Sequence, residues 1–182
     1  LKKYTGLRKN RRHKPGRAFE NSYYTFDILS DYGSFRDLQR HRLMTIEWQK
    51  MNPELGFNFP DEVKKTPYEN ECKELITKSR ELYEKLEASF PHLKEYSLLF
   101  GHNIRYSMTM NIRQAFHLIE LRTAKQGHIS YRKVCMKMHD QIKDIAGHSN
   151  FYELMNFTDH EEYELQRLDS EVKQAKKKEN FN

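Results

Sequence analysis

The chain has 182 residues, of which 32% are charged and 13% aromatic, and its formal charge at pH 7 is +6. This length suffices for one domain with a hydrophobic core, and this composition is typical of a globular protein rather than a disordered one. No apolar run approaches the ~20 residues that cross a bilayer, and no signal peptide is visible, which excludes a membrane protein and favours a cytoplasmic one.

Two further features bear on the setting of the chain. Cys72 and Cys135 form no CxxC pair and have no metal-ligand spacing, so we expect free thiols in a reducing compartment. The chain begins with Leu1 rather than methionine, which is compatible with a processed chain or with part of a longer protein.

The first half of the chain predicts a strand and two helices. Residues 1–18 are basic and are broken by Pro15-Gly16, which predicts an extended arm. Alternating apolar residues predict a half-buried strand over 21–29, and Ser34 is a plausible N-cap for a helix over 35–50. A proline-containing loop then leads to a long amphipathic helix over 68–90.

The second half predicts a shorter helical segment, a strand and more helices. These elements are the segment 91–100, a strand over 102–110, helices over 111–122 and 129–146, and a charged C-terminal helix over 158–182. We therefore expect three parts, with a folded domain over 19–157 between the arm and the last helix. The fold class is α+β, with a small antiparallel sheet and several long helices. Two strands make a poor sheet, so we expect an unrecognised strand, another domain or another subunit to complete it.

The helix over 111–122, NIRQAFHLIELR, combines apolar and cationic residues. Asn111 is a candidate N-cap, and Arg113, His117 and Glu120 share one face. Guanidinium groups on a mostly apolar helix need partners when buried. Those partners are either a carboxylate such as Glu120 or an anionic ligand such as a phosphate.

A second cluster is Arg40-His41-Arg42. On the predicted helix these side chains would fan over more than half of the circumference, which suits a large anionic ligand, whereas an exposed basic helix is the alternative. A Walker loop, GxGxxG, HExxH and GxSxG are all absent, and the histidines show no zinc-type spacing, so the sequence predicts no metal site.

The chain resembles the flavin-dependent thymidylate synthases over roughly residues 13–145. In that family an Arg-His-Arg motif follows a strand with an aromatic-Glu pair upstream, here Phe19-Glu20. An Asn-x-Arg helix that continues to a Leu-Arg pair is the second motif, and Asn111, Arg113, His117, Leu121 and Arg122 match it.

The resemblance implies reductive methylation of dUMP to dTMP by a homotetramer, with FAD as cofactor and NADPH and methylenetetrahydrofolate as co-substrates. It assigns FAD contacts to Arg40, His41, Arg42, Leu43, Asn111, Arg113 and His117. It assigns nucleotide contacts to Arg40, Lys50 and Arg122. Arg122 would be the catalytic residue, because its guanidinium would favour the ionised uracil ring.

The chain departs from the family pattern in the nucleotide loop. Lys50 stands where the family has a serine, Asn52 where it has an arginine, and Glu95 at or near a further expected arginine. A carboxylate at that position would repel a nucleotide phosphate, so the flavin half of the signature matches better than the dUMP half.

Two alternatives to an active synthase follow. One is a non-catalytic domain of the same fold that acts as the structural partner of an intact synthase domain. The other is a basic nucleic-acid-binding domain, favoured only by the pI of about 9.2 and lacking a base-reading motif.

Overall fold

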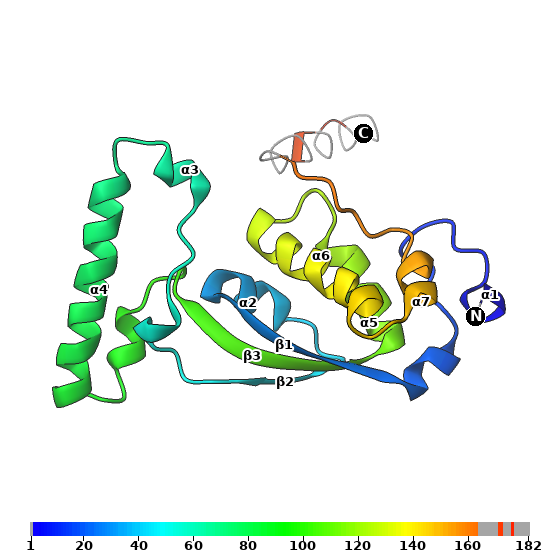
Figure 1. Cartoon of the computed structure of the whole chain (residues 1–182), viewed down its shortest axis with the longest axis horizontal. Helices are drawn as coiled ribbons and strands as arrows, with labels where there is room; N and C mark the ends of the chain where they lie inside the picture. Colours follow the sequence, from blue (N-terminus) through cyan, green and yellow to red (C-terminus); the bar gives the residue numbers. More distant parts are fainter. Residues whose placement is uncertain (1, 164–170, 173–175, 177–182) are drawn as a thin grey trace. The chain divides into compact units, whose positions relative to one another are not determined.

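The protein is described by a computed structural model that covers residues 2–163, 171, 172 and 176. Within this part of the chain, one sheet of three antiparallel strands forms in the order β1-β3-β2 (Figure 1). The strands are β1 (Tyr23–Asp31), β2 (Thr45–Trp48) and β3 (Asn103–Asn111). The predicted α+β class, with a small antiparallel sheet and several helices, is confirmed.

Strands β1 and β3 lie close to their predicted positions. Alternate side chains of β1, among them Phe26 and Ile28, are buried, as the period-2 pattern predicted. A cross-strand pair joins the two strands, because the Thr25 and Thr109 hydroxyl oxygens are 2.9 Å apart.

The predicted helix over 35–50 is wrong in its second half. Helix α2 (Tyr32–Leu38) ends before the Arg-His-Arg motif, and Thr45–Trp48 forms β2. β-branched and aromatic residues favour this strand, and the Gln49 amide continues the pairing by donating to the Arg105 carbonyl at 3.0 Å. Strand β2 is the element that the two predicted strands lacked.

The N-cap of α2 also differs from the prediction. Asp31, rather than Ser34, caps the helix, since its Oδ1 accepts a hydrogen bond from the Ser34 amide at 2.8 Å. The second carboxylate oxygen accepts from the Ser34 hydroxyl, also at 2.8 Å. A carboxylate has more acceptor sites than a hydroxyl, so Asp31 satisfies both donors at once.

The residues group into two compact units. The α4 unit comprises 27–40 and 46–108 and contains α2, α3 (Asp61–Lys64), α4 (Glu69–Ser89) and the short 3-10 helices Pro53–Leu55 and Lys94–Ser97. Helix α4 confirms the helix predicted over 68–90, while the segment 91–100 forms only the 3-10 helix Lys94–Ser97. The Ser79 hydroxyl donates to the Ser97 carbonyl at 2.6 Å, which fastens that turn to α4.

The α5 unit comprises the described residues among 1–26, 41–45 and 109–182. Its helices are α1 (Lys2–Thr5), the 3-10 helix η1 (Arg17–Asn21), α5 (Ile112–Arg122), α6 (Ile129–Asp144) and α7 (Ser149–Leu154). Helices α5, α6 and α7 pack side by side (Figure 1). The predicted N-cap of α5 is confirmed, because Asn111 Oδ1 accepts from the Gln114 amide at 2.8 Å.

Apolar side chains from several of these elements form the core of the α5 unit. Phe116 of α5 is fully buried, and its ring lies 6.0 Å from that of Phe19 in η1. The face of α5 that the apolar spacing placed inward is therefore the buried one. In the described part of the chain, no helix combines the length and apolar character needed to cross a membrane.

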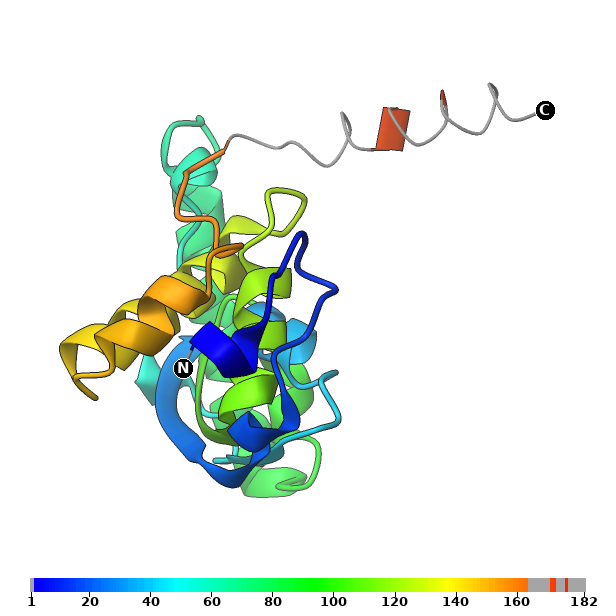
Figure 2. The same cartoon turned by 90° about the vertical axis from the view of Figure 1, so that its right-hand side faces the viewer.

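Both ends of the chain differ from their predicted form. The arm over 1–18 contains the helix α1, and Figure 2 shows this part of the chain, in blue, beside α5. Residues 158–163 form no helix, because two of their backbone groups are engaged elsewhere: the Asp159 amide donates to Thr123 Oγ1, and the Glu161 carbonyl accepts from Arg132. Most of the remaining predicted C-terminal helix lies outside the described residues.

Candidate functional site

A cavity of about 510 Å³ lies in the α5 unit at the N-terminal end of α5. This volume falls within the range of about 300–1,000 Å³ that is usual for small-molecule sites. The cavity is lined by Lys14, Glu20, Tyr23, Leu43, Met44, Thr45, Thr109, Met110, Asn111, Arg113, Gln114 and His117. The N-cap geometry of Asn111 therefore begins α5 at the cavity wall, and the next turn of the helix supplies Arg113 and His117.

Arg113 is held in place by two acceptors from the start of the chain. Its Nε donates to the Pro15 carbonyl at 2.8 Å, and its Nη1 donates to Glu20 Oε1 at 2.9 Å. The Arg113 side chain is 30% exposed. A guanidinium fixed in this way is oriented toward the cavity without being fully desolvated.

The ion-pair partner of Glu120 in the described part of the chain is Arg8 rather than an arginine of α5. The Glu120 carboxylate is 1% exposed and forms a bidentate ion pair with the guanidinium of Arg8. Arg8 Nη1 and Glu120 Oε1 are 2.8 Å apart. The sequence left either a carboxylate or an anionic ligand as the partner of Arg113. The structure shows a carboxylate, which is that of Glu20 and not that of Glu120. Because Glu120 is turned inward, the predicted shared face contributes only Arg113 and His117 to the cavity wall.

Arg122 lies at the other end of α5 and contacts the Arg-His-Arg segment. Its Nε donates to Nε2 of His41 at 2.8 Å, and its guanidinium carbon is 5.3 Å from the Tyr131 ring centroid. Since His41 Nε2 accepts this bond, its proton is on Nδ1 and the ring is neutral. The His41 and His117 rings are 5.9 Å apart, so the two family motifs meet here.

Positive charge dominates the electrostatics of this region. Burial lowers the pKa of His41 to about 4, with further lowering by Arg122 and His117. Burial also lowers the pKa of His117, and Lys14, Arg11 and Arg122 lower it further. Nearby cations disfavour a second positive charge, so both imidazoles are neutral at pH 7 and the remaining potential is suited to an anion.

The predicted site residues fall into four groups. Leu43, Asn111, Arg113 and His117 line the cavity, and His41 and Arg122 contact each other beside His117. Arg42 is exposed and is not among the cavity-lining residues. Arg40 and Lys50 belong to the α4 unit, where both are exposed and Arg40 Nη2 is 3.8 Å from Asp37 Oδ1. The Arg-His-Arg motif is therefore on a loop, and its side chains do not fan around a helix.

Several lining residues were not singled out from the sequence as site residues. Lys14 was one member of a basic run, and Tyr23, Thr109 and Gln114 carried no motif. Glu20 had a signal, since it belongs to the Phe19-Glu20 pair, but its contact with Arg113 spans 93 positions and no local pattern reveals it.

The fold and the cavity define an α+β domain with a positively charged pocket at the start of a buried helix. The chain belongs to the thymidylate synthase complementing protein family, whose sequence profile matches residues 2–147. This confirms the family relationship that the two motifs indicated.

Curated relatives are similar along nearly the whole chain. A UPF0159 protein of Chlamydia muridarum is 36% identical over 171 residues, and one of Chlamydia pneumoniae is 35% identical over 174 residues. A UPF0159 protein of Thermoplasma acidophilum is 33% identical over 175 residues. These matches cover 94–95% of this chain but 32–35% of the relatives, so the chain spans about a third of their length.

The fold is also that of a solved enzyme. Thymidylate synthase X from Helicobacter pylori, whose crystal structure contains FAD and dUMP, superimposes with a TM-score of 0.56 at 16% sequence identity. The match covers 76% of each chain. At this identity the likeness concerns the fold.

Proposed function

We propose that this chain binds FAD in the α5 cavity and takes part in the reductive methylation of dUMP to dTMP, with NADPH and methylenetetrahydrofolate as co-substrates. One observation carries the proposal. Asn111, Arg113 and His117, which the family resemblance assigns to FAD, line one positively charged cavity. FAD and dUMP in the related Helicobacter pylori enzyme give further support.

The residues present fit a flavin dinucleotide. Lys14 and Arg113 provide cations for a pyrophosphate, and Tyr23 and Met110 provide apolar surface for a ring. Glu20 is an acceptor for hydroxyl or N–H groups of the ligand. Bound flavin supplies the redox chemistry, while the protein supplies position and charge.

Arg122 is the residue that we assign to the pyrimidine. Its side chain is oriented by the neutral His41, whose Nε2 accepts from Arg122 Nε. The permanently charged guanidinium would stabilise negative charge on the uracil ring and so favour its ionised form. His41 acts in this proposal as a positioning residue.

The first experiment is the visible absorption spectrum of the purified 182-residue chain, before and after addition of FAD, followed by a dUMP titration. A flavin spectrum that dUMP perturbs would support both ligand assignments. Flavin without a dUMP response would limit the proposal to cofactor binding. No flavin under any condition would contradict it.

Two variants test the flavin contact and the nucleotide contact separately. Arg113→Ala should lose bound flavin and keep its circular dichroism spectrum, whereas Arg80→Ala, which removes an exposed arginine of α4 paired with Glu54 and Glu84, should keep its flavin. Arg122→Lys should keep flavin and lose the dUMP response, because an ammonium lacks the planar fork. A dUMP response equal to that of the wild type would remove Arg122 from the site.

A second candidate is a domain that contributes structure, and not turnover, to a longer protein. The chain spans about a third of the relatives it matches, and Glu95 and Lys50 stand where the family pattern has neither residue type. The assay is dTMP formation by the isolated chain with FAD, NADPH and methylenetetrahydrofolate. Flavin binding without any dTMP would favour this second candidate.

A further inference from the structure

Three potential metal ligands meet where α6 faces the segment after α7. They are His139 and Asp140 of α6 and His160 of the segment after α7, and one ligand atom from each lies within 4.8 Å of the other two. His139 Nδ1 is 2.8 Å from His160 Nε2, and His160 Nε2 is 3.9 Å from Asp140 Oδ1. None of the three lines the α5 cavity.

The protonation of His139 is fixed by its other nitrogen. Nε2 lies 2.9 Å from the carbonyl oxygen of Tyr152, which can only accept a hydrogen bond. Nε2 therefore carries the proton, and Nδ1 presents a lone pair toward His160. A ligating histidine in a metal site shows this arrangement, in which the second nitrogen donates to a carbonyl or carboxylate.

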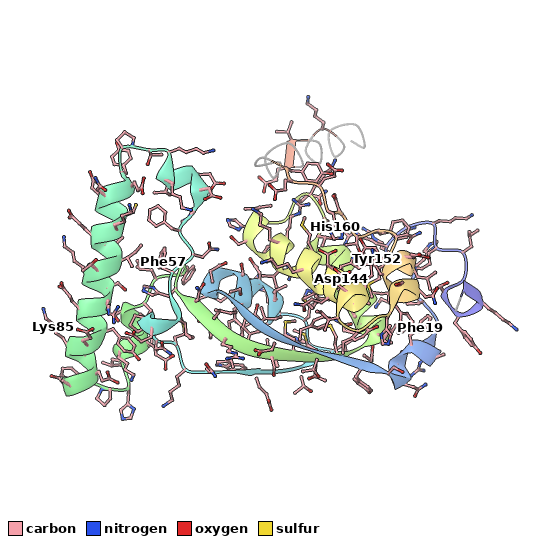
Figure 3. All side chains as sticks on the ribbon, viewed as in Figure 1. Phe19, Phe57, Lys85, Asp144, Tyr152 and His160 are labelled. Atoms are coloured by element: carbon pink, nitrogen blue, oxygen red, sulfur yellow. The ribbon has the colours of Figure 1, made fainter. Side chains whose placement is uncertain are left out.

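The environment also holds the His139 ring in one orientation. The side chain is 4% exposed, and the ring stacks on Tyr152 with centroids 4.0 Å apart and planes inclined by 13°. Figure 3 labels Tyr152 and His160 next to α6. A buried ring with a fixed donor and a fixed stacking partner is a preorganised ligand.

His160 is presented by a segment that is anchored on both sides. The Asp159 amide donates to Thr123 Oγ1 at 3.1 Å, and the buried Arg132 donates from Nη2 to the Glu161 carbonyl at 2.8 Å. Arg132 is 1% exposed and also donates from Nε to the Thr123 carbonyl. These bonds keep the backbone in place while the His160 ring, which is 37% exposed, retains room to move.

We propose that His139 Nδ1, His160 Nε2 and the Asp140 carboxylate form a binding site for a divalent transition-metal ion of the Zn²⁺ type, with water as the fourth ligand. Imidazole nitrogens and a carboxylate are the ligands that Zn²⁺ takes in proteins, at about 2.0–2.2 Å. Two nitrogens bound tetrahedrally lie about 3.3 Å apart, so the exposed His160 ring needs to move outward by only about 0.5 Å.

This site was not visible in the sequence. His139 and His160 are 21 positions apart, outside any local zinc motif, and they meet only because α7 returns the chain to α6. The proposal departs from the prediction of no metal site and is independent of the flavin proposal. A bound ion would fasten the segment after α7 to α6.

The test uses the full 182-residue chain, freed of metal with EDTA and then titrated with ZnCl₂ in a calorimeter. We expect one Zn²⁺ per chain and, with CoCl₂ instead, the visible absorption bands of a tetrahedral cobalt site. His160→Ala should weaken Zn²⁺ binding by more than about 100-fold, because removing a ligand costs more than the ~10–100-fold that outer contacts cost. His92→Ala, at an exposed histidine of the α4 unit, should bind like the wild type.

Asp140→Asn provides an independent variant at a partly exposed position, where folding is not at risk. It should weaken Zn²⁺ binding by about 10-fold or more while leaving the circular dichroism spectrum unchanged. The absence of stoichiometric Zn²⁺ binding, or wild-type affinity in His160→Ala, would overturn the site and leave a structural hydrogen bond between two histidines. Wild-type affinity in Asp140→Asn would overturn the three-ligand set.

Discussion

Glu120 is the most deeply buried acidic side chain with a described ion pair, and its partner Arg8 comes from the start of the chain. We expect Arg8→Met to destabilise the protein by about 3–5 kcal/mol, because it leaves a buried carboxylate unpaired. Urea unfolding at pH 7 measures the loss. The control is Arg17→Met, which removes an arginine that is 85% exposed and should cost less than about 1 kcal/mol.

The double variant Arg8→Met/Glu120→Leu separates the charge from the packing. With no buried charge left, it should recover much of the stability that Arg8→Met alone loses. Equal losses in Arg8→Met and Arg17→Met would mean that Glu120 finds solvent or another partner when Arg8 is absent.

His41 makes the free energy of unfolding depend on pH. Its pKa of about 4 in the folded chain lies below the ordinary 6.5, so between pH 6.5 and 4 the unfolded chain binds a proton here that the folded chain does not. Stability therefore falls as the pH decreases through this window. On lowering the pH from 7 to 4.5, His41→Gln should lose about 2 kcal/mol less than the wild type in urea unfolding.

The wild-type pH profile of the free energy of unfolding provides the comparison for this measurement. If His41→Gln followed that profile, then His41 would be protonated in the folded protein and could not accept the bond from Arg122 Nε.

At the scale of the elements, hydrophobic periodicity predicted the positions of those helices and strands that the local sequence determines. Helices α4, α5 and α6 and strands β1 and β3 lie within a few residues of their predicted positions. The helix over 35–50 failed because Phe35, Leu38 and Ile46 have helical spacing, while the chain gains more by pairing Thr45–Trp48 with β3, more than 50 positions away. Here the hydrogen bonds between two strands that are distant in sequence outweigh the local preference for a helix.

The same distinction between local and non-local contacts explains which part of the candidate site could be predicted from the sequence. Asn111, Arg113 and His117 were predicted together because they share one helix start, and they line one cavity. Two contacts of the site, that of Arg113 with Glu20 at the cavity and that of His41 with Arg122 beside His117, connect residues 93 and 81 positions apart. Spacing within a motif cannot predict such pairs.

The cap of α2 offers an element-scale prediction. Asp31 accepts hydrogen bonds from the Ser34 amide, the Ser34 hydroxyl and Asn58 Nδ2. Asp31→Ala should lower the free energy of unfolding by about 1–2 kcal/mol, as for other lost N-caps. Asp61→Ala, which removes an exposed carboxylate that pairs with Lys64 at the surface, should cost less than about 0.5 kcal/mol. Equal effects of the two variants would show that the cap does not stabilise α2.

At the scale of the whole molecule, the resemblance leads us to expect a homotetramer. Helix α4 exposes large apolar side chains, with Leu75 52% and Leu82 47% exposed, and Phe90 just after it is 59% exposed. Such a face is typical of an association surface. Light scattering should give a mass of about 88 kDa, four times 22.1 kDa.

Flavin retention should follow the association. Dilution below the dissociation constant of the tetramer should release FAD as the larger mass is lost. The charge-bearing substitution Leu82→Glu should shift both transitions, FAD release and dissociation, to higher protein concentration. A monomer that holds FAD at every concentration would contradict the assembly and leave the cavity of a single chain as the complete binding site.

The burial of Arg8 also governs how a protease meets the chain. Trypsin must draw an arginine side chain into its own pocket, yet that of Arg8 is 4% exposed and engaged by Glu120. The peptide bond after Arg8 should therefore resist brief digestion, while the bond after the exposed Arg17 is cut early. The beginning of the chain, basic and polar in composition, behaves in this respect as an integral part of the folded domain.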